Sequence, residues 1–206
     1  MEKLTPQSTA LLVVDMQNGM CSPQGSHARL SLDISRIRAV VGPCRRLIDA
    51  ARASGALVCY SYLAYAPDYS DGGFIVREIM PNIADSKVCQ RGSWDAQIVD
   101  ELAPQPGDVV VEKSRMSSFV RTDLEAQLRH RGIDNLIVCG VTTNVCVEST
   151  VRDAAQLDFR TFVVSDAVGE VDPARHEGAL NSMRWIFAKV VTTDEIVGAL
   201  SMRAVA

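Results

Sequence analysis

The chain has 206 residues, of which 47% are hydrophobic and 22% charged, a composition typical of a soluble globular protein with a full core. Its 21 basic and 25 acidic residues leave a net charge of −4 without a long Lys/Arg run, which argues against nucleic acid as a partner. No apolar stretch approaches the roughly 18 residues that span a bilayer, and the short apolar run near the N-terminus contains an aspartate, unlike a signal peptide. We therefore expect one cytoplasmic domain over residues 1–206, with no membrane partner.

Short, continuous apolar runs rich in β-branched residues recur along the chain. Such runs are typical of strands that are buried on both faces of a parallel sheet. The predicted strands are 10–14, 56–60, 108–111, 136–139, 161–164 and 190–192.

Segments with helical periodicity separate these strands. The first is 34–53. Thr122–Glu125 has the pattern of a capping box and predicts a helix that ends near Gly132. A further helix is predicted over 144–157. Another begins at Asp172 and Pro173 and runs through 185, and the last begins at 193. Six strands joined by crossover helices predict a mostly parallel, Rossmann-like α/β sheet flanked by helices.

One stretch, 64–92, has weak periodicity and contains two prolines and several glycines. An irregular segment of this length inside a compact domain is usually a functional loop or lid. It carries four large or charged side chains: Tyr65, Tyr69, Phe74 and Arg77.

Three reactive side chains follow predicted strands. Asp15 comes directly after the first strand, Lys113 after the third, and Cys146 at the first turn of the helix that follows the fourth. Each has an ordinary structural explanation: a turn aspartate, a solvated lysine, a packed cysteine. Open parallel sheets, however, bind ligands beyond the carboxyl ends of their strands. Together the three supply a nucleophile, a base and a cation at that edge.

Cys146 has a further reason to be reactive. A free thiol with a pKa of about 8.5 is only about 3% thiolate at pH 7. A helix N-terminus and a nearby lysine both favour the anion, so we expect them to lower the pKa of this thiol. The turn at 140–143 enters a helix and can present backbone N–H groups to a developing oxyanion.

Three segments resemble the isochorismatase-like cysteine hydrolase superfamily: ALLVVDMQ at 10–17, DVVVEKSRMSSF at 108–119 and CGVTTNVCVESTVRDA at 139–154. The last is the most specific, and the resemblance covers essentially the whole chain. Within the superfamily the chain is most similar to ureidoacrylate and N-carbamoyl amidohydrolases.

The resemblance implies a catalytic triad of Asp15, Lys113 and Cys146. It also implies a cis peptide bond between Val141 and Thr142, with the backbone amides of Thr142 and Cys146 as the oxyanion hole. It further suggests a homodimer or homotetramer.

Two departures narrow the resemblance. Nicotinamidases bind a metal through a D-x-H motif and a further histidine after the second strand, where this chain has no histidine. True isochorismatases lack the nucleophilic cysteine, which is present here. No C-x-x-C pair or Cys/His cluster with zinc-ligand spacing occurs among the six cysteines and three histidines. We therefore expect no metal and no cofactor.

These observations predict a cysteine-dependent amidohydrolase that cleaves an amide or ureido C–N bond of a small molecule through a thioester and releases ammonia. Two alternatives stay open: the same scaffold acting on a lactam or ester, and a redox-sensing or ligand-binding module, since an activated thiol also oxidises easily.

Five residues are candidates for substrate binding. Gln17 lies close to the predicted base, while Tyr62 and Phe119 are candidate apolar walls, although either is as well explained as core. Arg115 and Arg121 are candidate clamps for a substrate carboxylate, with a solvated basic face as their alternative.

Overall fold

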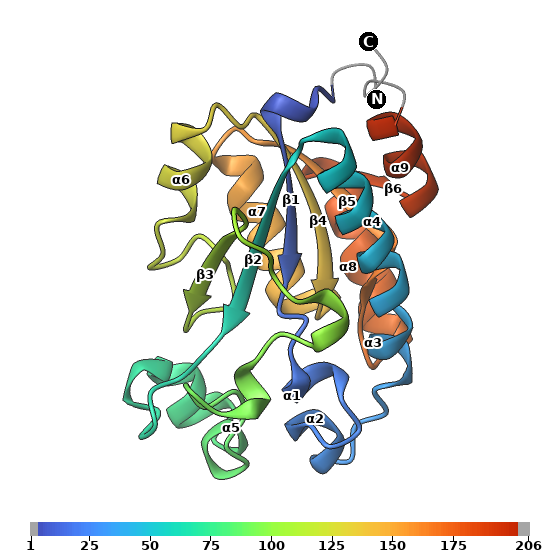
Figure 1. The fold of residues 1–206 in the computed structure, drawn as a ribbon. Coiled ribbons are helices and arrows are strands. Elements are labelled where there is room, and N and C mark those ends of the chain that lie inside the picture. Colours follow the sequence, from blue (N-terminus) through green and yellow to red (C-terminus); the bar gives the residue numbers. More distant parts are fainter. Residues whose placement is uncertain (1–3, 202–206) are drawn as a thin grey trace.

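The computed structural model describes residues 4–201, which form a six-stranded sheet with helices on both faces (Figure 1). Every strand pair is parallel, and the strand order is β3-β2-β1-β4-β5-β6. This confirms the predicted α/β architecture. The strands are β1 Thr9–Val14, β2 Leu57–Leu63, β3 Val109–Lys113, β4 Asn135–Val141, β5 Arg160–Gly169 and β6 Lys189–Val191.

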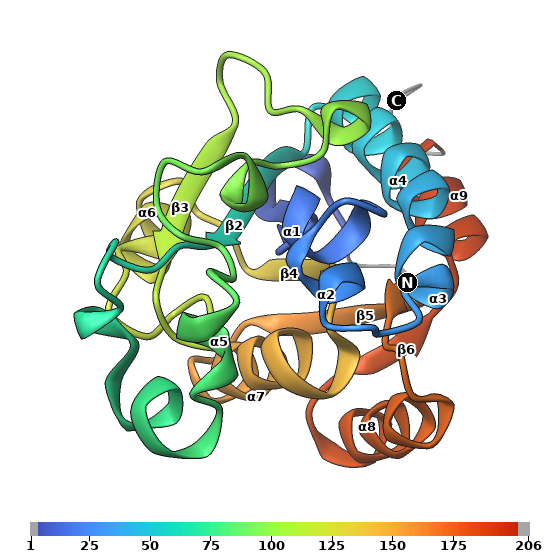
Figure 2. The same cartoon turned by 90° about the horizontal axis from the view of Figure 1, so that it is seen from below.

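The longer helices divide between the two faces of the sheet (Figure 2). On one face lie α3 Ser35–Ala39, α4 Val41–Ser54 and α9 Thr193–Ser201; on the other lie α6 Leu124–His130, α7 Glu148–Gln156 and α8 Pro173–Ile186. The central strand β1 alternates accordingly. Leu11 and Val13 pack into the first core, while Ala10, Leu12 and Val14 pack into the second. Burial on both faces explains why the strands read as unbroken apolar runs.

The predicted helix over 34–53 is interrupted. The chain forms α3 and α4, which are separated at Val40. Pro43 explains the break, because proline has no N–H for the carbonyl four residues earlier and its ring crowds that carbonyl. In the first turn of α4, where no partner is needed, the same proline is tolerated.

Short helices gather beyond the carboxyl ends of the strands (Figures 1 and 2). The irregular segment 64–92 contains the π-helical turn Ile75–Ile79 and α5 Asn82–Asp85. It lies in the same layer as α1 Asn18–Cys21 and α2 Ser26–Arg29, two helices that the sequence pattern did not predict. Within residues 4–201 no helix is long and apolar enough to cross a membrane.

Gly140 allows β4 to pass close to β1. Its φ is +113°, and a Cβ at this position would lie 2.1 Å from the Val14 carbonyl oxygen.

We expect Gly140→Ala to lower the free energy of unfolding by about 3 kcal/mol or more, because backbone strain and overlap add. Gly178→Ala in α8 is the matched control: its Cβ meets nothing within 4 Å, so a gain of about 0.5–1 kcal/mol is expected. Urea unfolding of both variants checks this; equal effects would contradict it.

Candidate active site

Three elements bring Asp15, Lys113 and Cys146 together at the carboxyl edge of the sheet. Asp15 follows β1 with a φ of 50°, Lys113 is the last residue of β3, and Cys146 lies in the π-helical turn Thr143–Val147 after β4. Lys113 Nζ donates to Asp15 Oδ2 at 2.7 Å and to Cys146 Sγ at 3.4 Å. The side chains of Asp15 and Lys113 are fully buried, and Cys146 is 4% exposed.

The ammonium of Lys113 uses a third contact to hold its position. It donates to the backbone carbonyl of Arg115 at 3.1 Å, so each of its three N–H groups has an acceptor. Asp15 is less fully used: within residues 4–201 its Oδ1 is buried without a hydrogen-bond partner. One carboxylate oxygen is thus fixed by the lysine and the other is available to accept a proton.

Burial sets the protonation of these groups. Burial raises the pKa of the Cys146 thiol well above its usual range, the nearby Asp15 charge adds to this, and Lys113 opposes it. Burial also raises the pKa of Asp15, against the opposing effect of Lys113. Burial alone would lower the pKa of Lys113, but the charges of Asp15 and Cys146 raise it.

These directions are opposite to the expectation that the pKa of the Cys146 thiol is lowered. The helix N-terminus and the lysine are present, but desolvation and a carboxylate outweigh them. The raised pKa favours the protonated thiol at rest. The raised pKa of Asp15 makes its carboxylate a stronger base than an exposed aspartate, and therefore better matched to a thiol proton.

We expect iodoacetamide to alkylate Cys146 slowly at pH 7, with a rate that continues to rise above about pH 9. The reason is that the thiolate is the reactive form and a raised pKa keeps it scarce. Peptide mass mapping against pH measures this, with Cys146→Ala as background because all six cysteines are buried. A fast rate that levels off below pH 8 would contradict this protonation state.

The backbone around Cys146 includes the two amides expected to form the oxyanion hole. The Val141–Thr142 peptide bond is cis. The Thr142 carbonyl accepts the amides of Val145 and Val147, both at 3.2 Å, and the amide of Cys146, which lies between them in sequence, is not a donor in either bond. The amides of Thr142 and Cys146 thus remain the candidate oxyanion donors that the resemblance implied.

A cavity of about 280 Å³ opens onto Cys146 and Thr142. Its walls come from the short helices beyond the sheet and from the end of β2. Most of the lining is apolar, including Met20, Leu63, Ile83, Val88, Met116 and Val145. A reactive side chain in the lining of a largely apolar cavity is the arrangement expected of a site for a small molecule.

Residues 9–195 match the family model described as the isochorismatase domain. The chain belongs to the isochorismatase family. A cysteine hydrolase from Pseudomonas syringae pv. phaseolicola is 33% identical with a TM-score of 0.88, covering 97% of this chain and 95% of its own. An isochorismatase family protein from Desulfovibrio vulgaris is 29% identical with a TM-score of 0.81, covering 94% and 98%. N-carbamoylsarcosine amidase from Thermoplasma acidophilum is 30% identical with a TM-score of 0.73, covering 91% and 97%.

The predicted carboxylate clamp is not formed in this isochorismatase-family chain. The Arg115 guanidinium donates to the carbonyl oxygens of Asp71, at 2.5 Å, and Ser114, at 2.7 Å, and does not line the cavity. Only the backbone of Arg115 reaches the triad. Arg121 is exposed and also lies outside the cavity.

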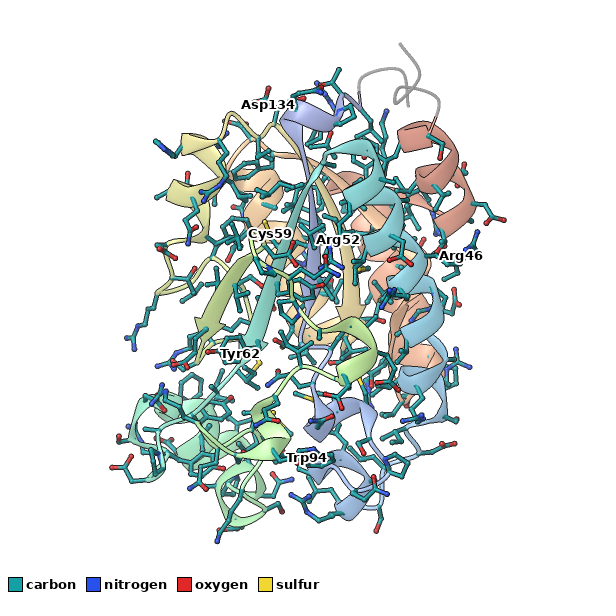
Figure 3. The ribbon with its side chains drawn as sticks, in the orientation of Figure 1. Arg46, Arg52, Cys59, Tyr62, Trp94 and Asp134 are labelled. Atoms are coloured by element: carbon teal, nitrogen blue, oxygen red, sulfur yellow. The ribbon has the colours of Figure 1, made fainter. Side chains whose placement is uncertain are left out.

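The two predicted aromatic walls also lie elsewhere. Tyr62, labelled near the end of β2 in Figure 3, donates to Glu112 at 3.1 Å and lines a different hollow. Because side chains alternate along a strand, its neighbour Leu63 faces the cavity instead. Phe119 stacks on Phe159 with ring centroids 5.9 Å apart.

Gln17 supports the site without lining the cavity. Its side-chain amide both donates to and accepts from the backbone of Leu63, each at 2.8 Å, and donates to the carbonyl of Ala96 at 2.8 Å. It fixes the segment after β2 against the loop near 96.

Sequence reasoning missed the roles of Tyr65 and His27, both of which line the cavity. The irregular segment was the signal for Tyr65, whereas His27 has no sequence signal. Asp95 holds His27's segment in place by accepting from the Ser26 amide at 2.9 Å, the Ser26 hydroxyl at 2.7 Å and the Cys89 amide at 2.9 Å.

Within the described part of the chain no group of three His, Cys, Asp or Glu side chains is placed to hold a metal ion.

Proposed function

We propose that this protein is a cysteine amidohydrolase that cleaves an amide or ureido C–N bond of a small molecule and releases ammonia. The observation that carries the proposal is the buried contact of Lys113 Nζ with both Asp15 Oδ2 and Cys146 Sγ, at the base of a cavity. Nucleophile, base and cation are then within reach of one bound carbonyl group.

In the first half of the reaction, Asp15 takes the thiol proton as the Cys146 sulfur bonds to the carbonyl carbon. The oxyanion accepts hydrogen bonds from the Thr142 and Cys146 amides, and each such donor contributes typically 10²–10³ in rate. Collapse of the tetrahedral intermediate breaks the C–N bond. Asp15 returns the proton to the departing nitrogen, and an acyl or carbamoyl thioester remains.

In the second half, water replaces ammonia. Asp15 accepts a proton from the water as its oxygen attacks the thioester carbon, and the C–S bond breaks to release the acid and restore the thiol. Lys113 stays protonated throughout and stabilises the negative charge on Asp15 and on the sulfur as it develops. No redox partner or further reactant is needed.

A panel of primary amides, ureido acids, lactams and esters tests the proposal, with ammonia and acid release measured for the wild type and Cys146→Ala. Ammonia release from an amide or ureido compound that vanishes in the variant is the expected result. Turnover of esters or lactams alone would replace the proposed reaction with one of the alternatives. No turnover together with reversible oxidation of Cys146 by dilute peroxide would favour the redox module.

A further inference from the structure

The lining of the cavity carries no charge of its own. Among the described residues that line it, none is Asp, Glu, Lys or Arg. Three partly exposed apolar side chains, Leu32, Met80 and Val145, border the route from the surface to the sulfur. An anionic group entering this space would lose its water without gaining a cation, which is costly.

Three cations around the site already make contacts within the protein. Lys113 is held in the triad, and the Arg115 guanidinium donates to two backbone carbonyls. Arg175 borders an adjoining hollow, where it forms a 3.0 Å ion pair with the buried carboxylate of Glu170. None of these three side chains lines the cavity.

Two polar atoms in the lining lack the partners that burial normally requires. Tyr65 is fully buried, and its hydroxyl has no hydrogen-bond partner among residues 4–201. The same is true of His27 Nδ1. An unsatisfied buried polar group costs about 1–3 kcal/mol, and both residues line the cavity, so these two atoms are candidate partners for a ligand.

The character of these two groups indicates what they recognise. Burial raises the pKa of Tyr65, so its hydroxyl is neutral, and Tyr65 lines the same cavity as Cys146. Burial lowers the pKa of His27, so its ring is neutral as well. Neutral hydroxyl and imidazole groups suit uncharged donors and acceptors.

We propose that the substrate is an uncharged amide or ureide whose non-reacting part is apolar, and that Tyr65 and His27 hydrogen-bond its polar atoms next to the scissile C–N bond. The hydrolysis of this substrate rests on the proposed function. The preference for binding an uncharged molecule does not. A volume of about 280 Å³ sets the substrate at the small end of protein ligands.

A pair of nearly isosteric amides tests the preference. 4-Methylpentanamide carries an isopropyl group where succinamate carries a carboxylate, and the two are otherwise alike. We expect kcat/KM for the neutral amide to exceed that for succinamate by at least about 100-fold, from the cost of burying an unpaired carboxylate. Arg175→Gln should leave the value for the neutral amide unchanged. Equal or faster turnover of succinamate would overturn the inference while leaving the amidohydrolase intact.

Two tyrosines of the same segment give a matched test of the residue assignment. Tyr65→Phe should lower kcat/KM for the neutral amide about tenfold or more without lowering Tm, because its hydroxyl has no partner in the protein. Tyr69→Phe should do the opposite: its hydroxyl donates to the Val88 carbonyl at 3.1 Å, so Tm should fall by about 2–4 °C with kcat/KM within about twofold. Unchanged kcat/KM in Tyr65→Phe, or a lowered Tm there, would overturn the role of Tyr65.

Binding to Cys146→Ala separates the inference from the reaction. Saturation-transfer NMR with the same two amides should show contact with 4-methylpentanamide and none with succinamate at equal concentration. If only 4-methylpentanamide binds but the wild type does not turn it over, the binding inference holds and amide hydrolysis is rejected. Binding of succinamate, or of neither compound, would overturn the inference.

Discussion

Cys146→Ala is expected to lower kcat/KM for amide hydrolysis by about 10⁴-fold or more, because loss of a nucleophile removes the covalent route entirely. The side chain is small and 4% exposed, so the fold should survive its truncation. Steady-state ammonia release, with circular dichroism to confirm folding, measures the effect.

Cys59→Ala is the matched control for this variant. Cys59 is fully buried in β2, within the core on one face of the sheet, and plays no part in the triad. The same change there should cost stability and leave kcat/KM near that of the wild type. Residual activity above about 1% in Cys146→Ala would contradict a nucleophilic role, since removal of a nucleophile leaves far less.

The buried ion pair should produce the largest effect on stability. Lys113→Met leaves the Asp15 carboxylate buried without its cation, and breaking a buried pair in this way costs about 3–5 kcal/mol. The double variant Lys113→Met with Asp15→Asn removes both charges and should recover most of that loss while staying inactive. A denaturant-based double-mutant cycle measures the coupling; simple additivity of the two single variants would contradict it.

An exposed ion pair of similar length provides the comparison. Arg46 and Asp194 are 2.6 Å apart but 57% and 82% exposed. Arg46→Met should therefore cost no more than about 1 kcal/mol. The two ion pairs have nearly the same N–O distance. A much larger loss of stability in Lys113→Met than in Arg46→Met therefore identifies burial as the cause.

The same variant should respond to pH in a definite direction. In Lys113→Met the effect that opposes the raised pKa of Asp15 is gone, so the folded-state pKa rises further above its unfolded value. A group of this kind binds its proton more tightly in the folded protein, so stability falls as pH rises through the folded pKa. Lys113→Met should therefore lose less stability, relative to wild type, at acidic than at neutral pH.

Local patterns were sufficient to predict the sheet and to bring three reactive side chains to the same edge of it. Runs such as 10–14 carry both burial and strand propensity in consecutive residues, and a strand end fixes where the next side chain emerges. The clustering of Asp15, Lys113 and Cys146 was therefore predictable from their positions at or just after the ends of β1, β3 and β4. The break between α3 and α4 was also present in the sequence, at Pro43, but periodicity masked it.

The substrate cavity was not predictable in the same way. Which of Tyr62 and Leu63 faces the cavity depends on strand register, and the position of His27 depends on contacts such as Asp95 with Ser26, which are distant in sequence. The direction of the pKa shift of Cys146 differed from the prediction for a related reason. The position of Cys146 in its motif shows that a helix end and a lysine, both of which lower a thiol pKa, are nearby. How far the thiol is desolvated depends on the folded surroundings of the whole site.

The most direct test of the account is to identify the atom that becomes acylated. Wild-type protein is mixed with an amide that it hydrolyses and is quenched in acid within milliseconds. The protein should then gain the mass of one acyl group. The adduct should map to the peptide that contains Cys146 and be removed by hydroxylamine, as a thioester is. Full turnover with no adduct on Cys146 under conditions that slow the second half-reaction, or turnover retained by Cys146→Ala, would contradict the account.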